Sequence, residues 1–226
     1  MSIKISTPAV IVNFKSYSEA EGKNALFIAE ICEDVSKNTG VCISVCPPIV
    51  ELSMIADRVN IPVLSQHADP LDAGAQTGRI TPSSIKAAGG AGTLLNHSER
   101  RMILSDLAKA ISICNEISLQ SVACADSAET AGAIAFFRPD FIAVEPPELI
   151  GGNVSVTTAK PDVVTKAVES VRKVDEQIPV FCGAGVKTGK DVKRAIELGA
   201  DGVLLASGII KSKDIRRTLE DLLKYI

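Results

Sequence analysis

Lys15, His97 and Glu145 each lie just after a short apolar run, where a side chain emerges from a buried strand. A carboxylate can act as a general base, a neutral imidazole can donate a hydrogen bond to a substrate oxygen, and a lysine supplies a fixed positive charge. Together they would supply a base, a hydrogen-bond donor and a positive charge at one site. Each also has an ordinary interpretation: a solvated lysine, a helix-capping histidine and an exposed loop glutamate.

The segments that begin at His97 and Glu145 favour the catalytic interpretation. His97 opens His-Ser-Glu-Arg-Arg, which we expect to begin a helix, and the positive end of the helix dipole would keep the imidazole neutral. Glu145 opens Glu-Pro-Pro-Glu-Leu-Ile-Gly-Gly, in which prolines stiffen one end and glycines free the other. Such a segment is typical of a lid, and closure of the lid would bury Glu145 and raise its pKa.

Two segments of small residues, Cys182–Gly185 and Leu205–Gly208, follow the last two apolar runs. Small residues let backbone N–H groups approach an anion, and the second segment could start a helix aimed at it. Each segment alone could equally be a tight turn. The pair favours a phosphate site, because the loops after strands seven and eight bind phosphate in many barrel enzymes.

The elements that must position these residues are short β-branched runs, which alternate with helix-period segments along the chain. This alternation indicates an α/β fold with a parallel sheet, and eight units favour a closed (βα)8 barrel. An open doubly wound sheet is the alternative, but no Gly-x-Gly-x-x-Gly follows the first strand. We expect a single domain over residues 1–226, because no linker interrupts the pattern. The predicted strands are Ala9–Asn13, Cys42–Cys46, Pro62–Gln66, Thr93–Asn96, Ser121–Ala125, Phe141–Val144, Val180–Gly183 and Gly202–Leu205.

The composition excludes several classes of function. Hydrophobic residues make up 46% and charged residues 23%, as in globular chains, and a net charge of −3 without a basic run argues against nucleic acid or an anionic membrane as partner. No apolar run could span a bilayer and no secretory leader pattern is visible, so we expect a cytoplasmic protein. Six cysteines without a Cys-x-x-Cys pair, and only two histidines, argue against a metal site and indicate reduced, buried thiols.

The motifs together resemble the triosephosphate isomerase family. The resemblance rests on the Asn-x-Lys at Asn13, the His-Ser-Glu-Arg-Arg and Glu-Pro-Pro-Glu-Leu-Ile-Gly segments and the two loops of small residues, whose order and spacing fit from Asn13 to Gly208. The short chain resembles the compact archaeal branch. The resemblance implies a closed barrel that interconverts glyceraldehyde 3-phosphate and dihydroxyacetone phosphate through an enediolate, without a metal or organic cofactor.

The resemblance also implies a role for each motif residue. Lys15 would hold the substrate electrostatically with the amide of Asn13 beside it, and His97 would polarise the carbonyl group. Glu145 would carry the proton between the two carbons, and Glu99 would position Lys15.

Further positions would contact the phosphate or a neighbouring subunit. Thr77 lies in a segment that would insert into a neighbouring copy, which implies a homodimer and, for the archaeal branch, a homotetramer. The residues expected at the phosphate are Ile150, Gly151, Gly185, Ala206 and Ser207.

Two departures from the family pattern and two rival functions remain. Gly152-Asn153 replaces the usual Thr-Gly at the end of the lid, which could soften its hinge, and His67 stands where an Asn is common. We expect His67 either near Thr77 and a subunit contact or as a surface histidine. The rivals are a Schiff-base phosphosugar aldolase, which needs a desolvated lysine inside the barrel, and a phosphosugar-binding barrel without catalysis.

Overall fold

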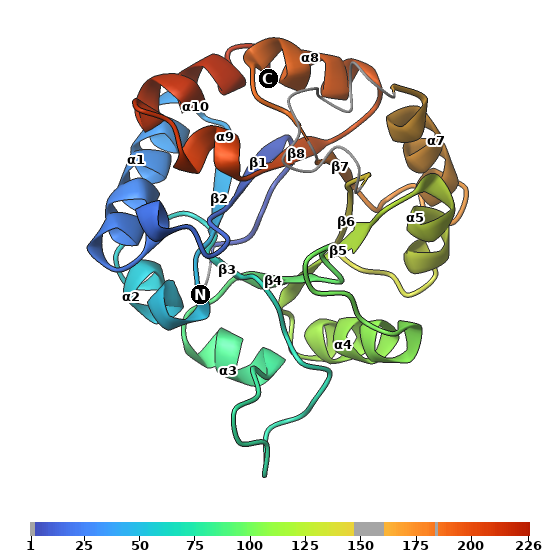
Figure 1. The fold of residues 1–226 in the computed structure, drawn as a ribbon. Coiled ribbons are helices and arrows are strands. Elements are labelled where there is room, and N and C mark those ends of the chain that lie inside the picture. Colours follow the sequence, from blue (N-terminus) through green and yellow to red (C-terminus); the bar gives the residue numbers. More distant parts are fainter. Residues whose placement is uncertain (1–2, 147–160, 184) are drawn as a thin grey trace.

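The computed structural model describes residues 3–146, 161–183 and 185–226. Eight parallel strands form the wall of a barrel, and the helices surround it on the outside (Figure 1). The strands are hydrogen-bonded in the order β2-β1-β8-β7-β6-β5-β4-β3, in which sequential strands are neighbours. The predicted (βα)8 barrel is therefore confirmed, and the doubly wound alternative is wrong.

The strands coincide closely with the predicted runs. Four have the predicted bounds, while β4 and β5 begin one residue earlier and β4 and β7 end one residue earlier than expected. The bounds are β1 Ala9–Asn13, β2 Cys42–Cys46, β3 Leu64–Ser65, β4 Gly92–Leu95, β5 Gln120–Ala125, β6 Phe141–Val144, β7 Val180–Cys182 and β8 Gly202–Leu205.

The largest difference is β3, which was predicted as Pro62–Gln66 but has only two ladder residues. Pro62 has no N–H to donate, and its carbonyl accepts from Val45 N at 3.0 Å. With the single bridge between Val45 and Val63, this bond closes the barrel between β2 and β3. The short strand leaves Gln66 and His67 free of the ladder, so that their side chains can serve the site.

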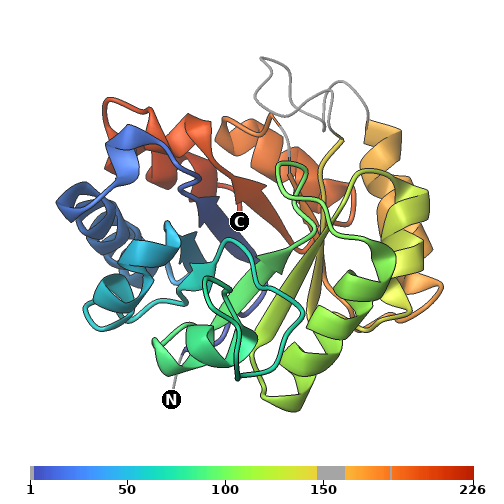
Figure 2. The same cartoon turned by 60° about the horizontal axis from the view of Figure 1, so that its bottom comes forward.

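Helices cover the outer face of the strands (Figure 2). Ser127 and Thr188 cap their helices, Thr188 in a reciprocal capping box with Asp191. The first long helix begins at Lys23 without a side-chain cap. The described helices are η1 Ser18–Ala20, α1 Lys23–Thr39, η2 Ile49–Glu51, α2 Leu52–Ala56, α3 Pro82–Ala87, α4 Leu104–Glu116, α5 Ala128–Ala135, α7 Pro161–Arg172, α8 Gly189–Glu197, α9 Ser207–Ile210 and α10 Ile215–Leu223.

Two apolar layers hold the barrel together. Alternate residues of β1 show the division, since Ala9 and Ile11 pack inside the barrel and Val10 and Val12 pack outward against the helices. A Cβ atom at Gly202 would collide with the backbone carbonyl of Ala9, so only glycine allows these strands to approach so closely. The aliphatic core makes the barrel a packed solid, with chemistry confined to its ends.

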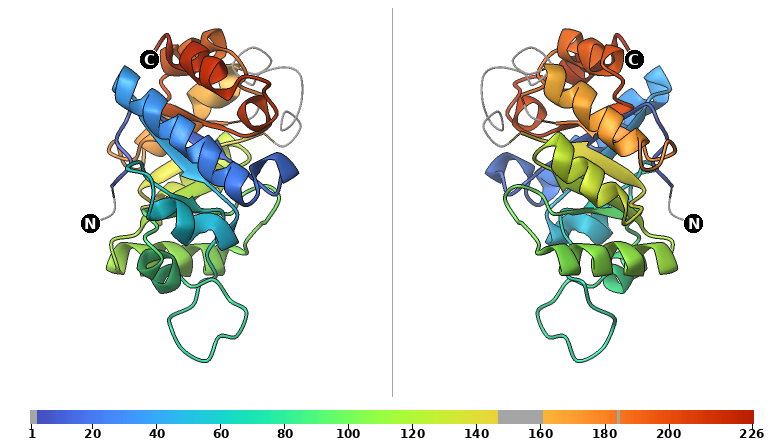
Figure 3. Two further views of the ribbon diagram at one scale, coloured as in Figure 1. Left: turned by 90° about the vertical axis from the view of Figure 1, so that its left-hand side faces the viewer. Right: turned by 90° about the vertical axis from the view of Figure 1, so that its right-hand side faces the viewer.

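The segment between β3 and α3 departs from this compact body. It extends well away from the barrel in both views of Figure 3, and Thr77 lies exposed within it. Of the helices in the described ranges, none has the length and apolar character needed to cross a membrane.

Candidate active site

The predicted site residues meet at the carboxyl ends of the strands. Asn13 is the last residue of β1, His97 follows β4 by two residues, and Glu145 directly follows β6. They line one pocket together with Lys15, and the loops after β7 and β8 form its other side. The pocket residues from those loops include Gly185, Ala206 and Ser207.

His97 is held in one orientation by the turn that follows it. Arg100 N donates to the carbonyl of His97 at 2.8 Å, and Glu99 N donates to His97 Nδ1 at 3.2 Å. A nitrogen that accepts a hydrogen bond carries no proton, so the neutral ring has its proton on Nε2. The helix expected directly after His97 is wrong, because α4 begins only at Leu104. One backbone N–H of the tight turn, rather than a helix end, therefore fixes the tautomer.

Glu145 is a buried carboxylate facing that proton. Its backbone N–H donates to Ala125 O at 2.8 Å, which continues the ladder beyond β6. Glu145 Oε2 lies 3.4 Å from His97 Nε2, but without hydrogen-bond alignment, so this oxygen has no hydrogen-bond partner among the described residues. Burial raises the pKa of Glu145, and this effect outweighs the lowering by the nearby His97 and Lys15. The result is a desolvated base, and it is buried even though the expected lid lies outside the described residues.

Residues of the neighbouring strands pack closely around this carboxylate. A Cβ atom at Gly183 would overlap the side chain of Glu145, and the buried Cys124 of β5 lies close enough to influence the pKa of this carboxyl. A larger residue at position 183 would displace the base. Gly183 is thus a positioning residue that the sequence analysis treated only as part of a phosphate loop.

Lys15 has a strained backbone. Its φ angle of 50° is in the left-handed region, which is uncommon for a residue with a long side chain. Asn13 Oδ1 accepts from Lys15 N at 2.9 Å, and Lys15 Nζ lies 2.8 Å from Glu99 Oε1. The strained turn and the ion pair direct a mostly buried ammonium group into the pocket.

Gln66 stabilises this turn and was missed by the sequence analysis. Its Nε2 donates to Lys15 O at 2.8 Å and to Cys46 O at 2.9 Å, joining the ends of β1 and β2 to the end of β3. The only sequence signal was a polar residue after an apolar run, which does not distinguish a positioning amide from a turn residue. Gln66 thus holds the carbonyl of the strained residue, while Asn13 holds its N–H.

The loops after β7 and β8 bound the other end of the pocket. Gly185 has a φ angle of 71°, a conformation that favours glycine. Tyr17 also lines this pocket, and Lys211 Nζ lies 4.5 Å above its ring, so a second cation is close by. Of the predicted phosphate contacts, Ile150 and Gly151 lie outside the described residues, as do Gly152 and Asn153 of the expected lid.

His67 is buried rather than a surface histidine. Its side chain lies beside Asp69, with Nε2 3.5 Å from Asp69 Oδ1. Burial lowers the pKa of His67, and the nearby Arg100 lowers it further. His67 faces a second hollow, which opens beside the catalytic pocket and is lined also by Val50 and Ile80.

These features define a (βα)8-barrel protein with an acid–base site at the carboxyl ends of its strands. The triosephosphate isomerase family model matches residues 8–225 of the chain. The chain belongs to the triosephosphate isomerase family.

Similar proteins support this assignment over nearly the full length. The chain is 49% identical over 220 residues to the triosephosphate isomerase of Methanothermobacter thermautotrophicus, covering 97% of this chain and 96% of the relative. It is 48% identical over 216 residues to that of Methanothermus fervidus, covering 96% and 97%. For Methanocaldococcus jannaschii the identity is 45% over 217 residues, covering 96% and 99%. The predicted resemblance to the archaeal branch is confirmed.

The buried carboxylate predicts a gain in stability when it is neutralised. Because the pKa of Glu145 is raised on folding, its ionisation opposes folding at neutral pH, and Glu145→Gln should raise the free energy of unfolding by about 1 kcal/mol at pH 7. The gain should shrink as the pH falls through the raised pKa towards the ordinary value, where folded and unfolded states both hold the proton. Denaturant unfolding at several pH values measures this.

The matched control is Glu30→Gln on an exposed position of α1. It should leave the free energy of unfolding nearly unchanged at every pH. A Glu145→Gln variant that is less stable than the parent at pH 7 would show that the carboxylate is satisfied in the folded protein.

Replacing the positioning amide should affect Lys15 rather than the base. Gln66→Met keeps the length of the side chain but leaves the Lys15 and Cys46 carbonyls without their donor. We expect inorganic phosphate to bind about tenfold more weakly, because the ammonium group is no longer held in place. Calorimetric titration measures the affinity, with the exposed Gln177→Met as control. Unchanged phosphate affinity would show that the turn at Lys15 is stable without Gln66.

Proposed function

We propose that this chain interconverts D-glyceraldehyde 3-phosphate and dihydroxyacetone phosphate by moving a proton between adjacent carbons. The observation that carries the proposal is the buried Glu145 carboxylate, which faces an imidazole with its proton on Nε2. The substrate is inferred from membership of the triosephosphate isomerase family. Glucose breakdown and synthesis both pass through this interconversion.

In the proposed mechanism Glu145 is the base. Its carboxylate takes the proton from the carbon beside the carbonyl, and the electron pair of that C–H bond forms the double bond of the enediolate. His97 Nε2 donates to the oxygen that gains charge, and the Lys15 ammonium stabilises the same charge electrostatically. Glu145 then returns the proton to the adjacent carbon, while the hydroxyl proton passes between the two oxygens. Every group needed is a side chain of this protein, so the proposal includes no metal and no organic cofactor.

The raised pKa of Glu145 suits this step. A base is effective when its conjugate acid has a pKa near the operating pH, and burial moves the carboxyl in that direction. Glu99 accepts from Lys15 Nζ and, through its backbone, donates to His97 Nδ1. One residue therefore orients both the cation and the electrophile.

The phosphate group would lie against the loops after β7 and β8. Gly185, Ala206 and Ser207 line that end of the pocket, and their small side chains leave backbone N–H groups accessible. Ile150 and Gly151 would complete the contact. Binding energy from this non-reacting end would hold the reacting carbons against Glu145.

The rival functions fit less well. A Schiff-base aldolase needs a lysine inside the barrel, and the sequences of the eight strands contain none. A binding barrel without catalysis would have no use for a desolvated carboxylate opposite an imidazole. We also place the protein in the cytoplasm, since all six of its cysteines are free thiols, as in a reducing compartment.

We propose further that two copies associate through the segment that carries Thr77. This segment stands far from its own barrel (Figure 3), and the hollow beside the catalytic pocket has an apolar rim at Val50, which is 82% exposed. Insertion of one copy's segment into the other's hollow would cover both. Each segment would then lie beside Lys15 and His97 of the other copy, because these two residues line the hollow as well as the catalytic pocket.

A second contact would join dimers into a tetramer. Ile103 and Leu104 are 67% and 60% exposed at the start of α4, and Phe136 is 72% exposed just after α5. An apolar groove between α4 and α5, lined by Met102 and Ile134, extends this surface. Exposed apolar surface of this kind is typical of an interface between subunits.

The proposed activity is tested with glyceraldehyde 3-phosphate in an assay coupled to consumption of dihydroxyacetone phosphate. The parent should turn over, and Glu145→Gln should reduce turnover by roughly 10²- to 10⁴-fold while inorganic phosphate still binds. The exposed Glu30→Gln serves as the control and should match the parent. A parent that binds phosphate without turnover would favour the binding barrel, and an adduct trapped on Lys15 by borohydride would favour the aldolase.

The two proposed contacts predict two different smaller assemblies. Val50→Asp places a charge in the hollow and should give a 23.7 kDa monomer with reduced activity. Leu104→Glu places a charge on α4 and should give an active dimer. Light scattering at micromolar concentration measures both masses. A fully active parent monomer would contradict the proposed association.

A further inference from the structure

Asp69 closes the base of the projecting segment. Its backbone N–H donates to Ile80 O, and Ile80 N donates to Asp69 Oδ2, both at 2.7 Å. Residue 69 precedes the segment and residue 80 ends it, so these two bonds join its ends. Asp69 itself is only 5% exposed.

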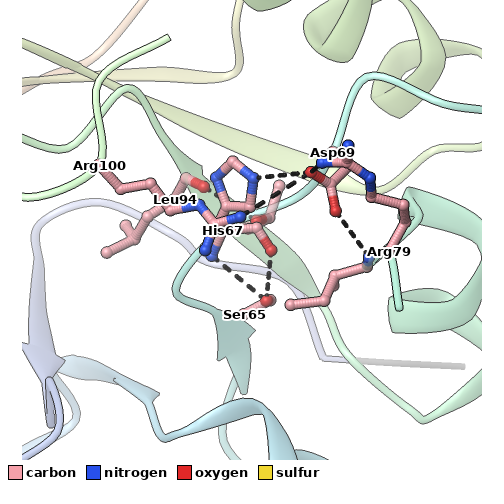
Figure 4. A network of polar contacts seen from close by, with 8 residues as sticks. Ser65, His67, Asp69, Arg79, Leu94 and Arg100 are labelled. Carbon is pink, nitrogen blue, oxygen red and sulfur yellow. Dashed lines mark hydrogen bonds and ion pairs between the residues drawn. The ribbon is translucent and has the colours of Figure 1, made fainter. Parts of the chain in front are cut away.

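The other carboxylate oxygen faces three nitrogen groups from three parts of the chain. Asp69 Oδ1 lies 3.5 Å from His67 Nε2, 3.4 Å from Arg79 Nη1 and 3.9 Å from Arg100 Nη2. Figure 4 shows the imidazole of His67 and the side chain of Arg100 on one side of the carboxylate and Arg79 on the other. His67 follows β3, Arg79 is in the projecting segment, and Arg100 is in the turn that follows β4.

The electrostatics of this cluster favour an ionised carboxylate. Burial would raise the pKa of Asp69, but the hydrogen bond from Ile80 and the contacts with His67 and Arg79 outweigh burial and lower it. The pKa of His67 is lowered by burial and by Arg100, so the imidazole is a neutral donor to Asp69. The cluster therefore contains one buried negative charge, which the two guanidinium groups compensate.

Arg100 connects this cluster to the catalytic residues. The same tight turn contains His97 and Glu99, and Arg100 N donates to the carbonyl of His97. Glu99 holds His97 Nδ1 through its backbone and Lys15 through its carboxylate. A displacement of Arg100 would therefore displace the turn that sets the position of the His97 ring.

We propose that Asp69 is a positioning residue for the isomerase reaction, which clamps the projecting segment against the turn at 97–100 and so fixes His97. This inference rests on the proposed function. The clamp acts through Arg100, and it joins the part of the chain that would enter a neighbouring copy to the part that polarises the substrate. Neither Asp69 nor Arg100 needs to touch the substrate.

The clamp should affect turnover more than substrate binding. The phosphate end of the pocket is formed by the loops after β7 and β8, and the residues that line this pocket include none of the three paired with Asp69. A small displacement of His97 would weaken its hydrogen bond in the transition state and leave the phosphate contacts intact. A loss of kcat with little change in KM is the signature of this role.

The test is a double-mutant cycle on the full-length protein, with kcat normalised by titration of active sites. Asp69→Asn and Arg100→Gln should each lower kcat roughly tenfold with KM nearly unchanged, and the double variant should be about as slow as the slower single variant. Arg101→Gln is the matched control, because this adjacent arginine pairs with Asp126 at 3.1 Å instead. Its effect should add to that of Asp69→Asn. Arg100→Lys, which keeps the charge, should restore part of the loss.

Imidazole NMR gives a second readout, since the protein has only two histidines. Arg100→Gln should shift the ring signals of His97 as well as those of His67, and Arg101→Gln should leave His67 unshifted. Because kcat is calculated per titrated active site, partial unfolding of a variant lowers the concentration of active sites but leaves the normalised kcat unchanged.

Two results would overturn the inference alone, given an active parent. One is an Asp69→Asn variant with parental normalised kcat, and the other is additivity of Asp69→Asn with Arg100→Gln together with unshifted His97 signals. A parent without isomerase activity would instead contradict the proposed function, and this inference with it. The parent's assay therefore separates the two failures before any variant is made.

Discussion

The site depends on one interaction, the burial of the Glu145 carboxylate opposite His97 Nε2 at the mouth of the barrel. Water would satisfy the carboxylate and weaken it as a base, and here strand β6 brings it into a dry site instead. The surroundings preserve this condition, because Gly183 leaves space for the carboxylate and the neighbouring Cys124 is itself buried. The backbone of Glu99 completes the arrangement by fixing the proton of His97 on the nitrogen that faces Glu145.

Such a site costs folding energy, and the barrel around it supplies the compensation. A buried oxygen without a partner and a left-handed lysine each oppose folding. Both occur at strand ends, while the strands themselves are mostly apolar and, apart from Cys42, buried. Gln66 and Asn13 confine the strain at Lys15 to one residue by holding its carbonyl and its N–H. The rigid wall thus lets a few side chains remain in positions that water or free rotation would otherwise relax.

Much of this could be predicted from the sequence, because a barrel repeats one local pattern. The alternation of β-branched runs and helices predicted all eight strands, and the polar residues after them identified Lys15, His97 and Glu145. Gln66 and Asp69 could not be found this way, since Lys15 and Cys46 for the first and Arg100 for the second are distant in the sequence and approach them only in the folded barrel. β3 was predicted too long because Val63 and Leu64 form an apolar run typical of a strand, whereas the seam with β2 provides only one bridge. A neutral His97 was predicted from the dipole of a helix that does not begin there, and the tautomer, which was not predicted, is fixed by a backbone N–H of the turn.

The central claim is that Glu145 is a desolvated base in the free protein, and its titration tests this most directly. Carbon-13 labelling of the glutamate side chains followed by NMR should show one carboxyl that titrates clearly above the ordinary value of 4.5. That signal should be absent from Glu145→Gln and unaffected in the exposed Glu30→Gln variant. The account is contradicted if the signal lost in Glu145→Gln titrates at or below the ordinary glutamate value.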